Sequence, residues 1–276
     1  MRIVDNIAAL RIHTSLTRTN RAIETSTLRL SSGYRINSSG DDPAGFAIAL
    51  QLRNQVRTMN MADRNTLDGT SLLQTAESAL QDVQNMIHRI RELAVQAAND
   101  TYGPFERGNI QMEIDQLLNE IDDVTQKVEF NNIRLLNGEV QNMRVQVGGR
   151  QHMSINVSIQ PFTTYELFGL DRTDPTTYVE VDSHINAQTT IARADAALDI
   201  VSEQRAFLGA FINRFEYTSS SLRATVEATQ RSLSRIQDAD MAYEMMHLST
   251  NNVLSQAAMA IMAQVNARPQ QLLQLI

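Results

Sequence analysis

The chain has 276 residues, 42% of them hydrophobic, which is enough for a buried core and for one or two domains. Its net charge of −7, with no basic run, argues against a nucleic-acid-binding surface. The chain has no cysteine, which excludes disulfides and thiolate metal sites.

Aromatic residues make up only 5% of the chain and tryptophan is absent, so aliphatic side chains and methionine must supply the core. Such side chains suit the packing of helix on helix. Asp5 and Asn6 lie where a signal peptide would carry its apolar run. The charge-free stretch 245–267 is interrupted by polar residues, so we expect no membrane insertion. We therefore expect either a cytoplasmic protein or one that is exported without a cleaved leader.

A first helix is predicted near the start of the chain. Leu16, Ile23 and Leu30 are seven residues apart, which is the period of a coiled-coil stripe. The run Ser31, Ser32 and Gly33 marks the end of this helix.

A long second helix is predicted to begin at Pro43. Asp42 is its expected cap, because a carboxylate accepts hydrogen bonds from the free amides of the first turn and proline is tolerated at the first position. Asp41 and Asp42 lack further oxygen ligands at suitable spacing, so we interpret them as capping residues and predict no metal site there.

Two long stripes with alternating spacings of three and four residues dominate the chain, and eleven of the fourteen positions in each are apolar. At 1.5 Å per residue each stripe extends roughly 70 Å, which predicts a rod. The first stripe comprises Leu52, Gln55, Met59, Ala62, Thr66, Gly69, Leu73, Ala76, Leu80, Val83, Ile87, Ile90, Ala94 and Ala97. The second comprises Ile191, Ala194, Leu198, Val201, Arg205, Leu208, Ile212, Phe215, Ser219, Leu222, Val226, Thr229, Leu233 and Ile236.

Between the two stripes the sequence predicts a shorter helix and a β-hairpin. The helix is entered at Pro104 and its end is marked by Asn131 and Asn132. Its apolar positions are Ile110, Ile114, Leu117, Ile121, Val124 and Val128. Apolar residues then alternate with period two over 143–147 and 153–159 around a glycine turn, which predicts the hairpin. Residues 178–181 are a further possible strand.

A last helix is predicted at the end of the chain, where Leu254, Ala258, Ile261, Val265 and Leu272 keep spacings typical of a helical stripe. Residues 1–36 carry six arginines and two acids, net +4, whereas residues 239–276 carry one arginine and two acids, net −1. The opposite charges weakly favour pairing of the two ends.

The expected fold is therefore mainly α, an elongated antiparallel helical bundle or coiled coil with a small β-hairpin region. We predict a terminal coiled-coil domain from residues 1–42 and 237–276. Residues 43–236 are predicted to form a rod-like helical domain with the hairpin region near 137–185.

Several long motifs resemble bacterial flagellin, in the order in which that family has them. They are LRLSSGYRINSSGDDPAGFAIA, TLDGTSLLQTAESAL, RIRELAVQAAND, SRIQDADMAYE and AMAIMAQVNARPQQLLQLI. The resemblance covers nearly the whole chain. It implies a flagellin that lacks the variable outer domains and is exported unfolded to assemble into a helical tube for motility.

The resemblance also implies partners and site residues. The chain would polymerise with itself, with Leu16, Ile23, Leu30, Leu254, Ile261, Val265 and Leu272 as inner-tube assembly residues. The other implied partners are the flagellar export apparatus, an export chaperone, the filament cap, hook-associated proteins and the animal Toll-like receptor for flagellin. The implied location is outside the cell, with a periplasmic flagellum as the alternative. The residues that match the receptor segment, or that serve contacts between subunits, are Ile87, His88, Arg89, Leu93 and Glu113.

We expect no enzymatic activity, no cofactor and no bound metal. The five histidines are scattered without a metal-binding spacing, and the sequence has no nucleophile elbow, P-loop or dinucleotide fingerprint. One alternative is a hook-filament junction protein, which shares paired terminal helices. An alternative of another class is a signalling coiled-coil hairpin, against which the β-alternation of residues 143–159 argues.

Overall fold

The computed structural model describes residues 6–169 and 178–273, with side chains up to Ala267. As predicted, these residues are mainly α-helical with two small antiparallel strand pairs. The helices are α1 Ile7–Ser32, α2 Pro43–Ala97, α3 Pro104–Lys127, α4 Thr164–Leu167, α5 His184–Gln237 and α6 Met241–Leu273. The strands are β1 Glu129–Phe130, β2 Ile133–Arg134, β3 Met143–Gln146 and β4 Ser154–Val157.

The chain folds into two compact units. The terminal unit consists of Met1–Val56 and Glu227–Ile276, and the central unit is Arg57–Val226. The boundary between the two units falls inside α2 and inside α5, so each of these helices contributes to both units. The sequence had predicted domain boundaries at the start of α2 and at the end of α5.

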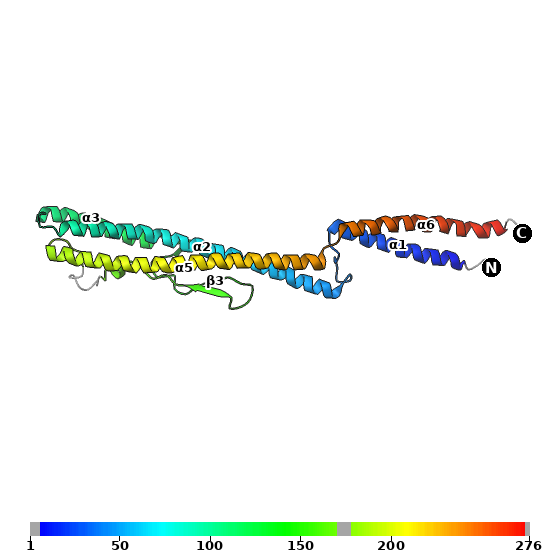
Figure 1. Cartoon of the computed structure of the whole chain (residues 1–276), viewed down its shortest axis with the longest axis horizontal. Coiled ribbons are helices and arrows are strands. Elements are labelled where there is room, and N and C mark those ends of the chain that lie inside the picture. The colour runs from blue at the N-terminus through cyan, green and yellow to red at the C-terminus, as the bar shows by residue number, and fades with distance from the viewer. Residues whose placement is uncertain (1–5, 170–177, 274–276) are drawn as a thin grey trace. The chain divides into compact units, whose positions relative to one another are not determined.

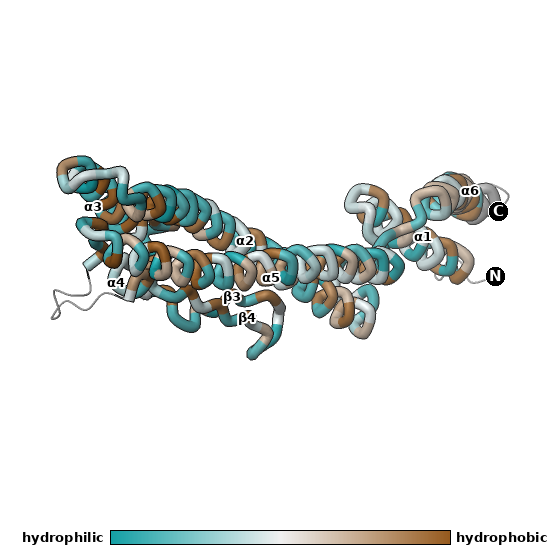
Figure 2. Tube along the Cα trace, turned by 60° about the vertical axis from the view of Figure 1, so that its left-hand side comes forward, coloured by the Kyte–Doolittle hydropathy of each residue, from teal (hydrophilic) through white to brown (hydrophobic). Residues whose placement is uncertain are grey.

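In the central unit α2, α3 and α5 lie side by side (Figure 1). The two long predicted stripes form the core there, and every stripe position from Ala62 to Ala97 is buried. No stripe position of α5 is fully exposed. Along both helices hydrophobic residues recur at intervals between hydrophilic ones (Figure 2). The period-3.5 pattern therefore fixed which face of each helix packs against its neighbours.

The hairpin β3–β4 packs against α2 and α5. Val145 pairs with Ile155, and both side chains are buried. Gly69 of α2 allows this close approach, because a Cβ there would lie 3.1 Å from the ring of Phe215 and 3.2 Å from Val145. The glycine within the long stripe therefore serves packing of the hairpin.

Two local expectations differ from the structure. The third helix ends at Lys127, earlier than the Asn131–Asn132 pair that was expected to mark its end. These two asparagines adopt φ values of 50° and 62° and form the turn of the short hairpin β1–β2. The predicted strand at 178–181 is wrong. Val179 and Val181 are buried as an alternating pattern requires, but their backbone groups bond to the side-chain amide of Gln111, which takes the place of a neighbouring strand.

A carboxylate of α3 has a structural partner in the loop region that follows the hairpin. Asp122 accepts hydrogen bonds from the backbone N–H of Thr164 at 2.9 Å and from its hydroxyl at 2.7 Å. It thereby attaches the single turn of α4 to α3.

In the terminal unit the linkers after α1 and before α6 pair with each other. Tyr34 and Asp238 form an antiparallel bridge, flanked by hydrogen bonds from Arg35 N–H to the Gln237 carbonyl and from Ala239 N–H to the Gly33 carbonyl. Gly33 has φ 75°, the left-handed conformation that ends α1. This bridge brings the ends of α1 and α5 and the start of α6 together.

The start of α2 has the geometry of a capped helix. Asp42 Oδ1 accepts the N–H of Gly45 at 3.0 Å, and Pro43 is the first helical residue. Asp41 caps the preceding turn, because its Oδ2 accepts from the N–H groups of Asn37 and Ser38. These hydrogen bonds lower the pKa of the Asp41 carboxyl.

Candidate assembly surface and contact segment

The terminal helices α1 and α6 pack against each other in an antiparallel pair. Side-chain hydrogen bonds link later residues of α1 with earlier residues of α6, as an antiparallel arrangement requires. Asn20 Oδ1 accepts the hydroxyl proton of Ser255 at 3.2 Å, and the hydroxyl of Ser26 donates to Glu244 at 3.0 Å. The Cα atoms of the two helices approach within 8 Å along the pair, which small side chains permit.

The face of α6 that meets α1 is defined by its least exposed positions, which alternate in steps of four and three. They are Glu244, Leu248, Asn251, Ser255, Ala258, Met262 and Val265. On α1 the half-buried positions include Leu16, Ile23 and Leu30, as the heptad spacing predicted. We call these facing positions the seam.

The seam has no apolar core. In the described parts of α1 and α6 the fully buried side chains are Ser26, Glu244 and Ser255, and all three are polar. A helix in water draws most of its stability from the packing of an apolar face. The isolated pair therefore buries too little apolar surface to account for its own helicity.

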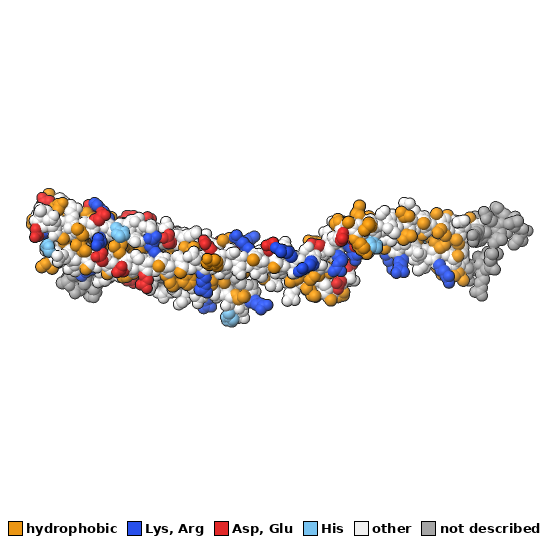
Figure 3. All heavy atoms as spheres, in the orientation of Figure 1, with side chains coloured by type: hydrophobic (Ala, Val, Ile, Leu, Met, Phe, Trp, Pro, Cys, Tyr) orange, Lys and Arg blue, Asp and Glu red, His pale blue; other side chains and the backbone are white. Residues whose placement is uncertain are grey.

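Apolar side chains are instead exposed on the outer faces of the pair. Figure 3 shows hydrophobic side chains gathered on the surface of these two helices. The large exposed ones are Ile7, Leu10, Leu28, Met241, Tyr243, Met245, Met246, Val253, Leu254, Met259 and Ile261. Exposed apolar surface of this extent marks a surface that binds other molecules.

Two of the predicted assembly residues lie off the seam. Leu254 is 52% exposed and Ile261 is 49% exposed, whereas the neighbouring Val265 is half-buried. The single apolar stripe expected on α6 was wrong, because its residues lie on two faces of the helix. Ala258 and Val265 lie at the seam, whereas Leu254 and Ile261 lie on an exposed face. The seven-residue spacing of Leu248, Ser255 and Met262 was the signal that would have found the seam. The side chain of Leu272 lies outside the described residues.

The contact segment on α2 and α3 has an ion pair at its centre. The guanidinium of Arg89 donates to one carboxylate oxygen of Glu113 from Nε at 2.9 Å and from Nη2 at 2.7 Å. Arg89 also donates to Glu92 at 3.3 Å. Hydrogen bonding to Glu113 raises the pKa of Arg89, so the side chain stays charged. His88 is exposed beside this cluster.

Leu93 does not project beside Arg89. It is 2% exposed and belongs to the core of the central unit, as does Ile87. Leu93 therefore contributes no apolar edge to the exposed surface beside the guanidinium. The surface of this segment is therefore charged, and its apolar members are inside the protein.

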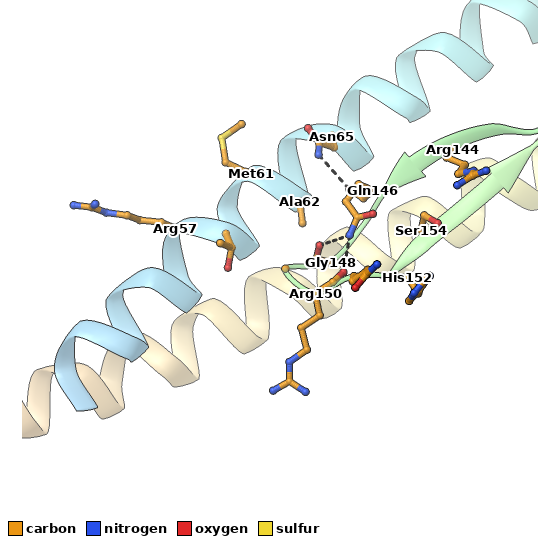
Figure 4. A pocket seen from close by; sticks show the side chains of 13 residues that line it. Arg57, Met61, Ala62, Asn65, Arg144, Gln146, Gly148, Arg150, His152 and Ser154 are labelled. Atoms are coloured by element: carbon orange, nitrogen blue, oxygen red, sulfur yellow. Dashed lines mark hydrogen bonds between the residues drawn. The ribbon is translucent and has the colours of Figure 1, made fainter. Parts of the chain in front are cut away.

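A surface hollow lies between α2 and the turn of the β3–β4 hairpin (Figure 4). Gln146 organises that turn by donating to the carbonyls of Gly148 and Arg150, while Asn65 donates to the carbonyl of Gln146. The guanidinium groups of Arg57 and Arg150 point away from each other and from the hollow (Figure 4). These two guanidinium groups therefore do not converge on the hollow.

Over residues 6–169 and 178–273 no helix is sufficiently long and apolar to span a membrane. In the same ranges no three His, Asp or Glu side chains gather into a possible metal site.

A helical protein whose terminal pair fully buries only polar side chains and exposes large apolar ones has the surface expected of a self-associating structural protein. Residues 3–141 match the bacterial flagellin N-terminal helical region, and residues 191–276 match the bacterial flagellin C-terminal helical region. The chain belongs to the flagellin family. It is a short form, in which only residues 128–183 separate α3 from α5. Flagellins are structural proteins and not enzymes, in agreement with the sequence-based prediction.

Similarity to individual relatives extends over the whole chain. The chain is 39% identical to a flagellin of Halalkalibacterium halodurans over 280 residues and 38% identical to a flagellin of Bacillus subtilis over 307 residues. It is 35% identical over 286 residues to the flagellar filament 33 kDa core protein of Treponema phagedenis. Each alignment covers 100% of both chains.

Two solved structures resemble the fold. The crystal structure of Bacillus cereus flagellin matches with a TM-score of 0.51 and 26% identity, covering 58% of this chain and 88% of that chain. A flagellar hook-associated protein of Vibrio parahaemolyticus matches with a TM-score of 0.59 and 12% identity, covering 72% of this chain and 100% of that chain. The second match shows the fold alone, and the family match favours a flagellin over a hook-filament junction protein or a signalling hairpin.

Proposed function

We propose that the chain is the structural subunit of a bacterial flagellar filament and that it polymerises through its terminal helices. The observation that carries this proposal concerns the α1–α6 pair, whose fully buried side chains are polar and whose large apolar side chains are in many cases exposed. Neighbouring copies would cover the apolar residues and supply the packing that the pair lacks. Named relatives that are filament core proteins support the same function.

Terminal deletion tests this function. A chain that lacks residues 1–36 and 239–276 should remain soluble and folded, because the apolar core cluster of the central unit comes from residues 72–215. It should not polymerise when salt or filament seeds are added, whereas the full chain should form tubes of uniform diameter under electron microscopy. Filaments formed by the deleted chain would overturn the assembly role of the terminal helices.

Within this function, the paired terminal segments 1–42 and 237–276 would form an inner domain of the filament. Leu16, Ile23, Leu30 and Val265 would stabilise the pair, while Leu254 and Ile261 would contact neighbouring copies. The filament would lie outside the cell, or in the periplasm as the alternative. Export apparatus, chaperone, filament cap and hook-associated proteins would be the other partners, as the family resemblance implies.

Receptor recognition is a second candidate function of the contact segment. His88, Arg89 and Glu113 form a charged, exposed surface that the Toll-like receptor for flagellin could bind in the free subunit. Arginine in a fixed pair is a common interface hot spot. Arg89→Ala should weaken receptor binding by about 1–4 kcal/mol.

The receptor measurement needs three protein forms. Affinity should be high for the parent monomer, lower for the Arg89→Ala monomer and absent for intact filaments in which neighbouring copies cover the segment. Arg64→Ala is a matched control, because Arg64 is exposed on the same helix outside the segment. Equal affinity of the parent and Arg89→Ala monomers would remove the receptor assignment.

A further inference from the structure

The outward side of α5 carries a second stripe of regularly spaced residues, on the side of the helix away from its core stripe. Every position of this outward stripe is exposed, and the intervals alternate between four and three residues, as in a coiled-coil seam. The outward stripe consists of Ala196, Ile200, Glu203, Phe207, Ala210, Arg214, Tyr217 and Ser221. It therefore has the form of a helix-packing face that the described ranges 6–169 and 178–267 leave uncovered.

Large apolar side chains are exposed on the outward stripe. Ile200 is 39% exposed, Phe207 is 42% exposed and Tyr217 is 78% exposed. The ring of Phe207 packs on that of Phe211, with 4.7 Å between the ring centroids. Aromatic residues of this kind are enriched where proteins bind one another.

Two surface hollows open beside the outward stripe. On α5 the first is bordered by Ile200, Glu203, Gln204 and Phe207, and the second by residues that include Ala210, Asn213, Arg214 and Tyr217. Each set follows the spacing i, i+3, i+4 and i+7, which forms the hole that receives a side chain of a facing helix in knobs-into-holes packing. The surface of α5 is therefore shaped to pack against another helix.

The charges of the outward stripe are complementary to each other across a two-fold axis. Glu203 and Arg214 both belong to the stripe, and among the described residues neither has an ion-pair partner. The guanidinium of Arg214 lies over the ring of Phe211, 5.8 Å from its centroid. An antiparallel second copy would set its Arg214 against Glu203 and its Glu203 against Arg214. The fitting partner for this stripe is thus the same stripe of another copy.

Size and charge favour one alignment of the two copies. In the antiparallel register that joins Glu203 to Arg214, the other layers join Ile200 to Tyr217, Phe207 to Ala210 and Ala196 to Ser221. A slide of one heptad would set Glu203 against Phe207 in one direction and against Ser221 in the other, so both charge pairs would be lost. A parallel pair would set Glu203 against Glu203 and Arg214 against Arg214, which is unfavourable because like charges repel.

We propose that the outward stripe of α5 binds a second copy of this chain in an antiparallel two-fold dimer. A two-fold contact uses the same surface on both copies and closes on itself. Ile200, Phe207 and Tyr217 of both copies supply its apolar contacts, and two pairs of Glu203 with Arg214 fix its alignment. Because one helix of each copy makes the contact, the dimer is weak and reversible.

This dimer and a growing filament exclude each other. A filament grows by a repeated head-to-tail contact, whereas the two copies of the dimer point in opposite directions. The dimer therefore holds free subunits in a form that cannot polymerise until the copies separate. This consequence rests on the proposed filament function, and the dimer itself does not.

Sedimentation of charge variants tests the dimer. The parent chain should show a concentration-dependent equilibrium between monomer and dimer in the analytical ultracentrifuge. Glu203→Arg alone and Arg214→Glu alone should each weaken dimer formation about tenfold or more, because each change sets like charges against each other. An equimolar mixture of the two variants should restore the affinity of the parent to within about threefold, since in the mixed dimer every arginine faces a glutamate.

Glu216→Arg is the matched control, because Glu216 is exposed on the same helix but lies outside the outward stripe. Its dimer affinity should equal that of the parent, and circular dichroism should show the same helicity for all variants. A parent chain that stays monomeric at every concentration would overturn the proposal. So would a mixture of the two stripe variants that associates no better than either variant alone.

Cysteine reporters test the antiparallel orientation, because the natural chain has no cysteine. On oxidation a mixture of Ala196→Cys and Ser221→Cys proteins should form linked dimers, since these positions face each other. Neither protein alone should link to itself, because like positions would lie 25 residues apart, about 38 Å along the helix. Self-linking of either protein, or no linking in the mixture, would overturn the proposed arrangement.

The chain that carries both Ala196→Cys and Ser221→Cys tests the consequence for assembly. Its oxidised, linked dimers should not extend filament seeds, and reduction of the disulfides should restore polymerisation. Linked dimers that extend seeds would overturn the exclusion between dimer and filament. If the parent chain itself failed to polymerise under seeding, the filament function would fail, while sedimentation and cross-linking would still decide the dimer.

Discussion

The terminal pair and the central unit both show heptad spacing, but the residues at the spaced positions are buried to different degrees in the two regions. In the central unit the stripe positions are mainly aliphatic, and they are buried by α2, α3 and α5 and by the β3–β4 hairpin. In the terminal pair the fully buried seam positions are polar, the aliphatic seam positions such as Leu16 and Leu248 are only half-buried, and many large apolar residues face outward. The backbones of α1 and α6 consequently approach more closely than those of α2 and α5.

A heptad pattern alone therefore does not identify a hydrophobic core. The central unit contains the partners that its stripes require, so it can fold by itself. The terminal pair lacks them, and we propose that other copies of the chain supply them. Five measurements test this contrast, beginning with the one expected to show the strongest change.

Hydrogen exchange should show the largest contrast. In the monomer, amides of Leu80, Val83 and Ile87 should exchange only through global unfolding, which costs about 5–15 kcal/mol in typical domains. Amides of residues 7–30 should exchange with little protection, because α1 has no apolar core. In filaments residues 7–30 should become protected. Strong protection of residues 7–30 in the monomer would contradict the comparison.

Core truncation should distinguish folding from assembly. Leu80→Ala should destabilise the central unit by about 2–5 kcal/mol, because the Leu80 side chain is fully buried and its loss leaves a cavity. Urea unfolding of the monomer followed by circular dichroism measures this change. Leu67→Ala provides the control, since Leu67 is exposed on the same helix. Similar unfolding midpoints for the two variants would show that the central stripe is not the core.

Truncation of the outer face of α6 should have the opposite result. The double change Leu254→Ala and Ile261→Ala should alter the unfolding free energy of the monomer by less than about 0.5 kcal/mol, as is usual for exposed sites. It should raise the protein concentration needed for polymerisation, measured by light scattering after seeding. Unchanged polymerisation would mean that neighbouring copies do not cover these residues.

Loss of the ion pair between α2 and α3 should have a small effect. Arg89 and Glu113 are both about half exposed, so Arg89→Ala should change the stability of the fold little and leave helicity unchanged. Circular dichroism and urea unfolding measure both quantities. Arg91→Ala is the matched control, because Arg91 pairs with Asp195 of α5 with similar exposure. A loss of helicity in the Arg89 variant alone would make Arg89 a structural residue.

The smallest expected effect concerns pH. The pKa of Asp41 is lowered in the folded protein, so its charged form contributes stability that is fully present above the usual value of 3.8. That contribution is lost as pH falls through the folded pKa. An NMR titration should show the Asp41 carboxyl titrating below the usual aspartate value of 3.8, and Asp41→Asn should remove the corresponding pH dependence of stability. Titration at the usual value would argue against the turn hydrogen bonds.

The sequence predicted the helices correctly but not the hydrogen-bond partners of the loop backbone. The motifs at the chain ends and the two long stripes defined the family and the packed faces of α2 and α5, because a helical period is a local property of the sequence. The strand expected at 178–181 failed for a nonlocal reason. Its alternation is real, but a side chain of α3, Gln111, binds its backbone.

The candidate site was predicted in part. Arg89 and Glu113 are exposed and in contact, whereas Leu93 is buried, since its exposure depends on how far α3 extends over α2. Glu244 was not singled out, because an acid near a helix start is common and its burial follows only from the position of α1.

The sequence by itself determined the helix boundaries at Gly33 and Pro43, the two buried stripes, the hairpin and the absence of cysteine chemistry. These features follow from local backbone preferences and from the spacing of apolar residues. Only the tertiary structure decided which face of α6 meets α1 and that a charged residue lies at their seam. Burial depends on which residues the other helix brings opposite, and no local pattern contains that information.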